Sequence, residues 1–170
     1  MARPQWESEF TEYFTARAPT MRRLAYALCG DWHTADDLLQ TTFVRLYPQW
    51  GRVDTETVDA YTRRILVNVY LSHRRRRWWE SLMSQPPDRP AAPPPDLGER
   101  LLVHWALARL APGQRAMVVL RHLEELSVAE VAELLGVSEG TVKSQTARGL
   151  QSLRATLTEP AFVGEECHHA

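Results

Sequence analysis

Cysteine is scarce in this sequence, whose 170 residues include only two, Cys29 and Cys167. A disulfide framework or a zinc knuckle needs paired cysteines at short spacing, so neither is expected. Cys29 lies near Asp31 and His33, and Cys167 precedes two histidines, but neither group has the spacing of a structural zinc site. We therefore expect reduced thiols, no metal and no cofactor.

Long apolar runs are also lacking. No stretch approaches the roughly 18 consecutive apolar residues of a membrane-spanning helix, and the first ten residues, MARPQWESEF, contain no apolar signal core. The sequence has no glycine-rich phosphate loop, no nucleophile motif and no recognisable pair of catalytic carboxylates. These absences predict a cytoplasmic protein that does not insert into membranes and is not an enzyme.

Lysine is almost absent, because the 20 basic residues are 19 arginines and Lys143. The formal net charge is -1 at pH 7, yet arginines gather at Arg63, Arg64 and residues 74–77. A protein near neutrality can still present a basic face. The run at 74–77, followed by two tryptophans, fits either a solvated helix end or a contact with DNA phosphates and unpaired bases.

Prolines divide the chain into two blocks. Residues 84–96 read SQPPDRPAAPPPD, and because prolines remove backbone donors and disfavour helix before them, we predict a linker there. The predicted units are an N-terminal domain at 5–83, a C-terminal domain at 97–158 and a disordered tail at 159–170. A hydrophobic content of 44% is sufficient for packed cores.

Apolar residues recur at helical spacing in both blocks, and no strand-like alternation is found. Thr34 before the acidic pair Asp36 and Asp37 indicates one helix start, and residues 54–57 ahead of Tyr61 indicate another. The fold class predicted is all-α, with two small helical domains joined by the proline-rich linker.

The C-terminal block contains a helix-turn-helix pattern. From Ser127 it reads SVAEVAELLGVSEGTVKSQTARGLQSLR, where Ser127 and Glu130 form a capping box at a helix start. Gly136 can adopt the left-handed conformation that ends this helix, and Ser138 can cap the next one. The alternative is a helical hairpin that only packs, since such caps and turns occur in many bundles.

The second helix of this pattern has the composition of a DNA-recognition helix. Val142, Leu150 and Leu153 are expected to face inward. The side chains expected on its outer side are rich in base-edge donors and phosphate ligands, namely Thr141, Lys143, Ser144, Gln145 and Arg148.

Three segments resemble the extracytoplasmic-function sigma factors of bacterial RNA polymerase. Residues 140–154, GTVKSQTARGLQSLR, are similar to the family's fourth conserved region, which grips the minus-thirty-five promoter element. Residues 35–50, ADDLLQTTFVRLYPQW, resemble the second region, whose helix docks on the clamp of the polymerase largest subunit. Residues 60–77, AYTRRILVNVYLSHRRRR, are similar to the segment that melts and captures the minus-ten element.

The resemblance implies three sets of functional residues. Polymerase binding is implied for Asp36, Asp37, Gln40, Phe43 and Arg45, although the two aspartates could instead serve only as partners of the helix dipole. Minus-ten recognition is implied for Tyr61, Arg63, Arg64, Asn68, Arg74 and Arg75. Minus-thirty-five recognition is implied for Ser138, Thr141, Lys143, Ser144, Gln145 and Arg148. Gln145 stands where the family often has arginine, and it could read adenine.

The function predicted is that of an alternative sigma factor, which binds core RNA polymerase through the clamp and the flap and directs initiation at promoter DNA. The two tethered, separately folded domains would grip the promoter together. An anti-sigma factor is a possible further partner. The alternatives are a helix-turn-helix regulator acting at an operator, whose N-terminal block should offer a sensor pocket, and a helical adaptor without DNA contact.

Overall fold

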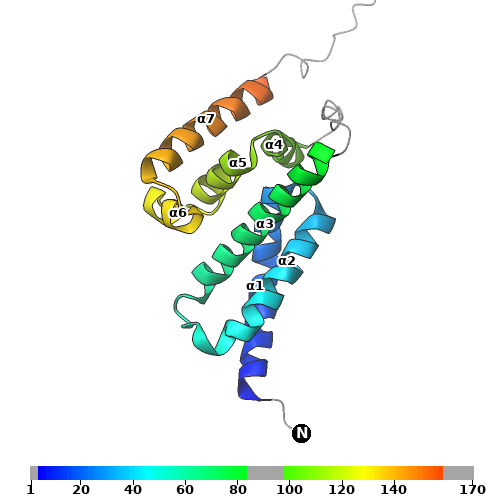
Figure 1. Ribbon diagram of the computed structural model, residues 1–170, viewed down its shortest axis with the longest axis vertical. Coiled ribbons are helices and arrows are strands. Elements are labelled where there is room, and N and C mark those ends of the chain that lie inside the picture. Colours follow the sequence, from blue (N-terminus) through cyan, green and yellow to red (C-terminus); the bar gives the residue numbers. More distant parts are fainter. Residues whose placement is uncertain (1–3, 84–97, 159–170) are drawn as a thin grey trace, which may run out of the picture.

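Helices make up the regular structure of the described chain. The computed structural model describes residues 4–83 and 98–158, the side chains of 77–83 excepted. It contains no strand within these ranges, which confirms the all-α prediction. In chain order (Figure 1) the elements are α1 (Gln5–Cys29), α2 (Trp32–Leu46), the 3-10 helix η1 (Tyr47–Arg52), α3 (Val58–Met83), α4 (Glu99–Ala108), α5 (Pro112–Val118), the π-helical turn η2 (Val119–Leu123), α6 (Val128–Leu135) and α7 (Glu139–Thr158).

The N-terminal domain is a bundle of α1, α2 and α3. Asp31 caps α2 by accepting a hydrogen bond from the Thr34 amide, so the helix begins at Trp32. The expectation that Thr34 marks this helix start is therefore wrong by one turn, because a carboxylate three residues earlier is the stronger cap. Residues 54–57 do precede α3, as predicted.

A partly buried polar contact joins α1 to α3. The Tyr13 hydroxyl lies 2.9 Å from both Asp59 Oδ1 and Thr62 Oγ1. Burial, with the adjacent Asp59 carboxylate, raises the pKa of Tyr13 to about 12, so this hydroxyl keeps its proton to a higher pH than an exposed tyrosine does. It donates to the carboxylate and fixes the relative position of the two helices.

The C-terminal domain contains the predicted helix-turn-helix in α6 and α7. Ser127 Oγ accepts from the Glu130 amide at 3.1 Å, and the Glu130 carboxylate accepts from the Ser127 amide at 2.6 Å. Gly136 ends α6 with a φ of 66°, and the hydroxyl of Ser138 accepts from the amide of Thr141 at the start of α7. These local predictions are confirmed.

Close packing of α7 on α5 requires a glycine. A Cβ atom added at Gly149 would lie 2.7 Å from Val118 Cγ2, well inside van der Waals contact. The absence of a side chain therefore sets how closely α7 approaches α5, a contact that was not predicted from the sequence.

The two domains pack against each other. One continuous cluster of buried apolar side chains includes Leu28 and Tyr70 of the N-terminal domain with Leu107, Val119 and Leu120 of the C-terminal domain. In Figure 1, α5 lies between α7 and α3, and it contacts α1 and α3. The expectation of separately folded modules needs correction, because the two domains share a core. The predicted linker at 84–96 and the tail at 159–170 lie outside the described residues.

Two further features bear on the class of protein. None of the helices in the described ranges has the length and apolar character needed to cross a membrane. Within the same ranges, no three His, Cys, Asp or Glu side chains gather in a way that could hold a metal ion.

Candidate nucleic-acid and polymerase interfaces

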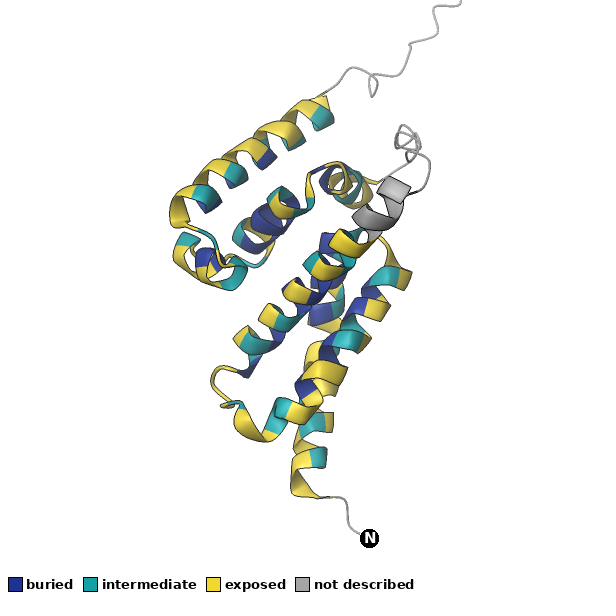
Figure 2. Cartoon of the chain, viewed as in Figure 1, coloured by how far each residue is buried: buried dark blue, intermediate teal, exposed yellow. Residues whose placement is uncertain are grey.

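The outer face of α7 carries polar side chains that are exposed to solvent. Lys143, Ser144 and Arg148 are exposed, while Val142 is fully buried against the domain core. Figure 2 shows this division as an exposed stripe along α7 opposite the side that packs on α5. Ser138 and Thr141 are bonded to each other at the helix start, so they shape the N-terminal turn that would enter a groove.

Gln145 does not point outward as the sequence analysis expects. Its side chain is half-buried, and its Oε1 atom accepts a hydrogen bond from Gln114 Nε2 of α5 at 3.0 Å. The amide thus holds α7 to α5. Because the partner lies 31 residues earlier in the chain, helical periodicity could not reveal it.

The residues expected to read the minus-ten element divide between two sides of α3. Arg64, Asn68 and Arg75 are exposed, and their spacing of four and seven residues places them along one face of the helix. This face combines two guanidinium groups with one amide, a set suited to phosphates and one base edge. The structure thus brings these three residues together.

The remaining three residues of that set face protein. Arg63 Nε lies 3.3 Å from Glu124 Oε2 at the end of η2. Arg74 is half-buried and close enough to Tyr70 and Arg115 to influence their pKa values. Tyr61 packs beside the small cluster of Phe43, Leu46 and Val58.

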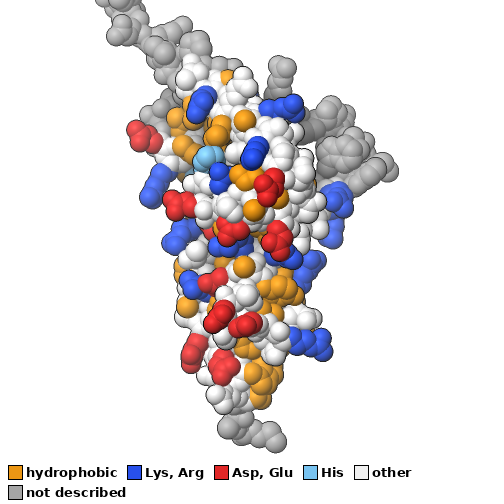
Figure 3. Space-filling model, turned by 90° about the vertical axis from the view of Figure 1, so that its left-hand side faces the viewer, with side chains coloured by type: hydrophobic (Ala, Val, Ile, Leu, Met, Phe, Trp, Pro, Cys, Tyr) orange, Lys and Arg blue, Asp and Glu red, His pale blue; other side chains and the backbone are white. Residues whose placement is uncertain are grey.

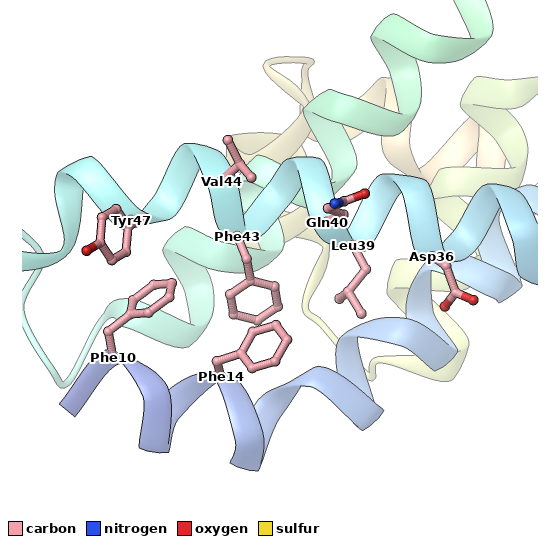
Figure 4. Close-up of a pocket in the computed structure, with 8 residues that line it drawn as sticks. All are labelled: Phe10, Phe14, Asp36, Leu39, Gln40, Phe43, Val44 and Tyr47. Atoms are coloured by element: carbon pink, nitrogen blue, oxygen red, sulfur yellow. The ribbon is translucent and has the colours of Figure 1, made fainter. Parts of the chain in front are cut away.

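An apolar groove runs between α1 and α2. It encloses roughly 690 Å³, and Figure 4 shows side chains from both helices directed into it. Val44 is 66% exposed, and Phe14 and Tyr47 are also exposed at this surface. An apolar groove open to solvent marks a protein-binding surface more often than a structural feature. Its lining residues are Phe10, Phe14, Asp36, Leu39, Gln40, Phe43, Val44 and Tyr47.

Three of the five residues expected to bind polymerase line this groove. Asp36 and Gln40 are exposed at its edge, but Phe43 is only 4% exposed and packs edge-on against Phe10 and Phe14. Phe43 therefore forms the floor of the groove and supports its shape. The other two, Asp37 and Arg45, are exposed on α2 outside the lining.

Asp36 is held in place by α1. The Arg22 guanidinium donates to both carboxylate oxygens of Asp36, and this hydrogen bond lowers the pKa of that carboxyl. The same guanidinium stacks over the Trp32 ring at 4.3 Å. The contact with Arg22 accounts for the position of the Asp36 carboxylate.

The contribution of α1 to this groove was not predicted from the sequence. Phe10 and Phe14 are spaced four residues apart on α1, a spacing that predicts a helix but does not show what the two side chains face. Val44 was the one signal of this groove in the sequence. It is an apolar residue among the polar side chains of α2, and such a residue indicates a protein-binding surface.

Comparisons with known proteins agree on one family. Residues 13–80 match the family described as Sigma-70 region 2, and residues 100–153 match Sigma-70, region 4. The chain is 41% identical over 154 residues to the RNA polymerase sigma-E factor of Streptomyces coelicolor, with 88% of this chain and 86% of that protein covered. It is 35% identical to the ECF RNA polymerase sigma factor SigE of Mycolicibacterium smegmatis, with 93% and 63% covered.

A solved structure shows the same fold in a related protein. The sigma factor RpoE of Bartonella quintana, determined in complex with the anti-sigma factor NepR, superposes with a TM-score of 0.71 at 25% identity, covering 88% of this chain and 96% of that one. The comparisons give no support to the operator-binding regulator. The chain belongs to the extracytoplasmic-function family of RNA polymerase sigma factors.

Proposed function

We propose that this sigma factor uses three of its surfaces in initiation: the α1–α2 groove for core RNA polymerase, the exposed face of α3 for the minus-ten element, and the outer face of α7 for the minus-thirty-five element. The observation that carries the proposal is that α7 is fixed by its cap, its turn and its packing while Lys143, Ser144 and Arg148 stay exposed.

The α7 surface is suited to duplex DNA. A helix that enters the major groove by its N-terminal half can place a lysine and an arginine on base edges or phosphates. Gln145 takes the role of a positioning residue in this account, because its amide is bonded to Gln114. Base reading then falls to Lys143, Ser144 and Arg148.

The α3 surface is suited to separated strands. Asn68 supplies an amide that can pair with the edge of an unstacked base, and Arg64 and Arg75 flank it with positive charge. Unstacking a base costs a few kcal/mol, so this contact favours sequences that open easily.

The α1–α2 groove is suited to a helical partner. Its apolar lining is edged by Asp36 and Gln40, which can orient a basic helix such as the polymerase clamp presents in this family. In this account the polymerase flap is a second contact, made by the C-terminal domain. An anti-sigma factor would be a further partner, since the Bartonella relative was determined with one. The protein would act in the cytoplasm, where the polymerase works, and has no enzymatic role of its own.

Run-off transcription with purified core polymerase on fragmented genomic DNA tests the proposal. We expect new 5′ ends at discrete sites when the wild-type chain is added. Val44→Arg should abolish both these transcripts and binding to core enzyme, because it places a charge at the exposed edge of the groove. Ser8→Arg, exposed on α1 outside the lining, is the matched control and should leave both intact. Equal activity of the two variants, or no new start sites with wild type, would contradict the proposal.

A further inference from the structure

An ion pair between α1 and α2 lies at one end of the α1–α2 groove. Arg22 of α1 donates from Nε to Asp36 Oδ1 at 2.5 Å and from Nη2 to Asp36 Oδ2 at 3.1 Å. Figure 4 shows the Asp36 side chain at this end of the groove, directed toward α1. Two parallel hydrogen bonds fix the orientation of a carboxylate more closely than one does. The Asp36 carboxylate therefore has a set direction before a partner binds.

Aromatic side chains hold the Arg22 guanidinium in turn. The guanidinium carbon lies 4.3 Å from the centre of the Trp32 ring, and a cation over an aromatic face is attracted to it. Tyr26, one turn after Arg22 on α1, stacks on Trp32 with the ring centres 3.9 Å apart and the ring planes 13° apart. His104 of α4 meets Tyr26 edge-on at 4.7 Å. Arg22 is thus held by two side chains of α2, Trp32 and Asp36.

Asp36 remains accessible to a partner although it is paired. Its side chain is 52% exposed. A carboxylate offers about four acceptor positions, and Arg22 donates one hydrogen bond to each of the two oxygens. The other positions can accept hydrogen bonds from a basic side chain of a helix that lies in the groove.

The charge of Arg22 does not by itself explain a role in binding. A positive Arg22 beside Asp36 repels a basic partner, so its charge alone would weaken the complex. The chain has a formal net charge of -1, and on the face shown in Figure 3 acidic and basic side chains are interspersed. Orientation of a partner on such a surface depends on individual groups that are held in place. An Asp36 side chain that is already ordered loses less conformational freedom on binding.

We propose that Arg22 is a positioning residue for polymerase binding, which holds the Asp36 carboxylate at the end of the α1–α2 groove so that it accepts a hydrogen bond from a basic side chain of the clamp helix. This inference rests on the proposed function of the groove. Arg22 acts through Asp36, and Trp32 acts through Arg22 by fixing the plane of the guanidinium.

Substitution of two neighbouring arginines tests the proposal. Arg22→Ala removes the partner of Asp36. Arg23→Ala is the matched control, because Arg23 is exposed and bonds to Thr20 of its own helix. Both substitutions remove one positive charge, so an effect of charge alone would leave binding unchanged or slightly tighter in both. Positioning predicts that only Arg22→Ala weakens binding, by about three- to tenfold. Titration of the fluorescently labelled full chain with core polymerase measures the affinity.

A double-mutant cycle separates positioning from a general loss of structure. Asp36→Ala should weaken binding by at least as much as Arg22→Ala, and Arg22→Ala should have no further effect once Asp36 is alanine. A merely structural role of Arg22 would weaken binding by the same factor in both backgrounds. Arg22→Lys keeps the charge and most of the side chain, so it should fold. A lysine does not donate two parallel hydrogen bonds, so this variant should also bind less tightly than wild type.

The outcomes separate this inference from the proposed function. Equal affinities of Arg22→Ala and Arg23→Ala, additive effects in the cycle, or wild-type affinity of Arg22→Lys would overturn the positioning role. If Val44→Arg abolishes binding and Arg22→Ala does not weaken it, the groove is the polymerase site and this inference alone fails. If the wild-type chain does not bind core enzyme, or Val44→Arg binds it equally well, the proposed function of the groove fails and the positioning role fails with it.

Discussion

The guanidinium of Arg115 donates a hydrogen bond to the carbonyl of Ala27, 88 residues earlier in the chain. The contact joins the C-terminal domain to the N-terminal domain. Burial at this position lowers the pKa of Arg115. A single buried side chain therefore links the stability of one domain to the position of the other.

Replacing Arg115 should destabilise the whole chain. Arg115→Ala removes the donor from the Ala27 carbonyl and leaves a void, so we expect a loss of about 1–3 kcal/mol in the free energy of unfolding. Urea denaturation followed by circular dichroism measures this loss. Arg100→Ala, at an exposed position on α4, is the control and should change stability by less than about 0.5 kcal/mol. Equal effects of the two substitutions would show that the interdomain contact contributes nothing.

The close approach of α7 to α5 gives a second prediction. Gly149→Ala places a methyl group 2.7 Å from Val118 Cγ2, and overpacking of this kind costs about 1–3 kcal/mol. Gly140→Ala, whose nearest neighbour would be 3.9 Å away, is the matched control and should be neutral or slightly stabilising. Thermal unfolding measures the stability of the two variants, and we expect a lower midpoint for Gly149→Ala. Similar midpoints would contradict the close packing of α7 on α5.

Substitutions at Gln145 and Arg148 should affect different properties, stability for the first and DNA binding for the second. Gln145→Ala loses the hydrogen bond to Gln114, so about 0.5–1.5 kcal/mol of stability should be lost. Arg148→Ala should leave stability within about 0.5 kcal/mol of wild type but weaken duplex promoter binding by about 1–3 kcal/mol. Denaturation and fluorescence anisotropy on the same two proteins test this split. If the Gln145→Ala protein were as stable as wild type but preferred different bases, Gln145 would be a base-reading residue, contrary to this prediction.

The capping box of α6 predicts a dependence of stability on pH. The hydrogen bond from the Ser127 amide lowers the pKa of the Glu130 carboxyl below its ordinary value of 4.5. Since the folded pKa lies below the unfolded one, the stabilisation is complete above about pH 5 and is lost as the pH falls through the folded pKa.

Comparison of Glu130→Ala with wild type checks this prediction. The melting temperature of the Glu130→Ala protein should lie below the wild-type value at pH 7. The difference between the two melting temperatures should shrink as the pH is lowered toward 3. Glu9→Ala, on the exposed surface of α1, should give a small difference that does not vary with pH. A Glu130→Ala deficit that persisted unchanged at low pH would argue against the carboxylate as the capping group.

Structural features that depend on residues close together in the chain could be predicted from the sequence. Contacts between residues far apart in the chain could not. Ser127, Glu130 and Gly136 act within one or two turns, so their roles followed from spacing alone. Gln145 and Phe43 are placed by partners on other helices, α5 for the first and α1 for the second. Residue type and periodicity place a side chain on a helix but do not identify what lies opposite.

The interdomain packing was missed for a related reason. The prolines at 84–96 predict a break between two helical blocks, but such a break says nothing about contact between the domains that flank it. Arg115 offered no signal, because a single arginine in an amphipathic helix is expected at the surface. Its burial depends on the end of α1, which only the folded chain brings near.

The most direct test of the central claim is transcription by core polymerase from a library of promoters with randomised upstream and downstream blocks, read by sequencing of the transcripts. The wild-type sigma factor should select bases in two separate blocks. Arg148→Ala should relax selection only in the upstream block, and Asn68→Ala only in the downstream block. Selection confined to a single block, or lost from both blocks in either variant, would contradict the assignment of α7 and α3 to separate promoter elements.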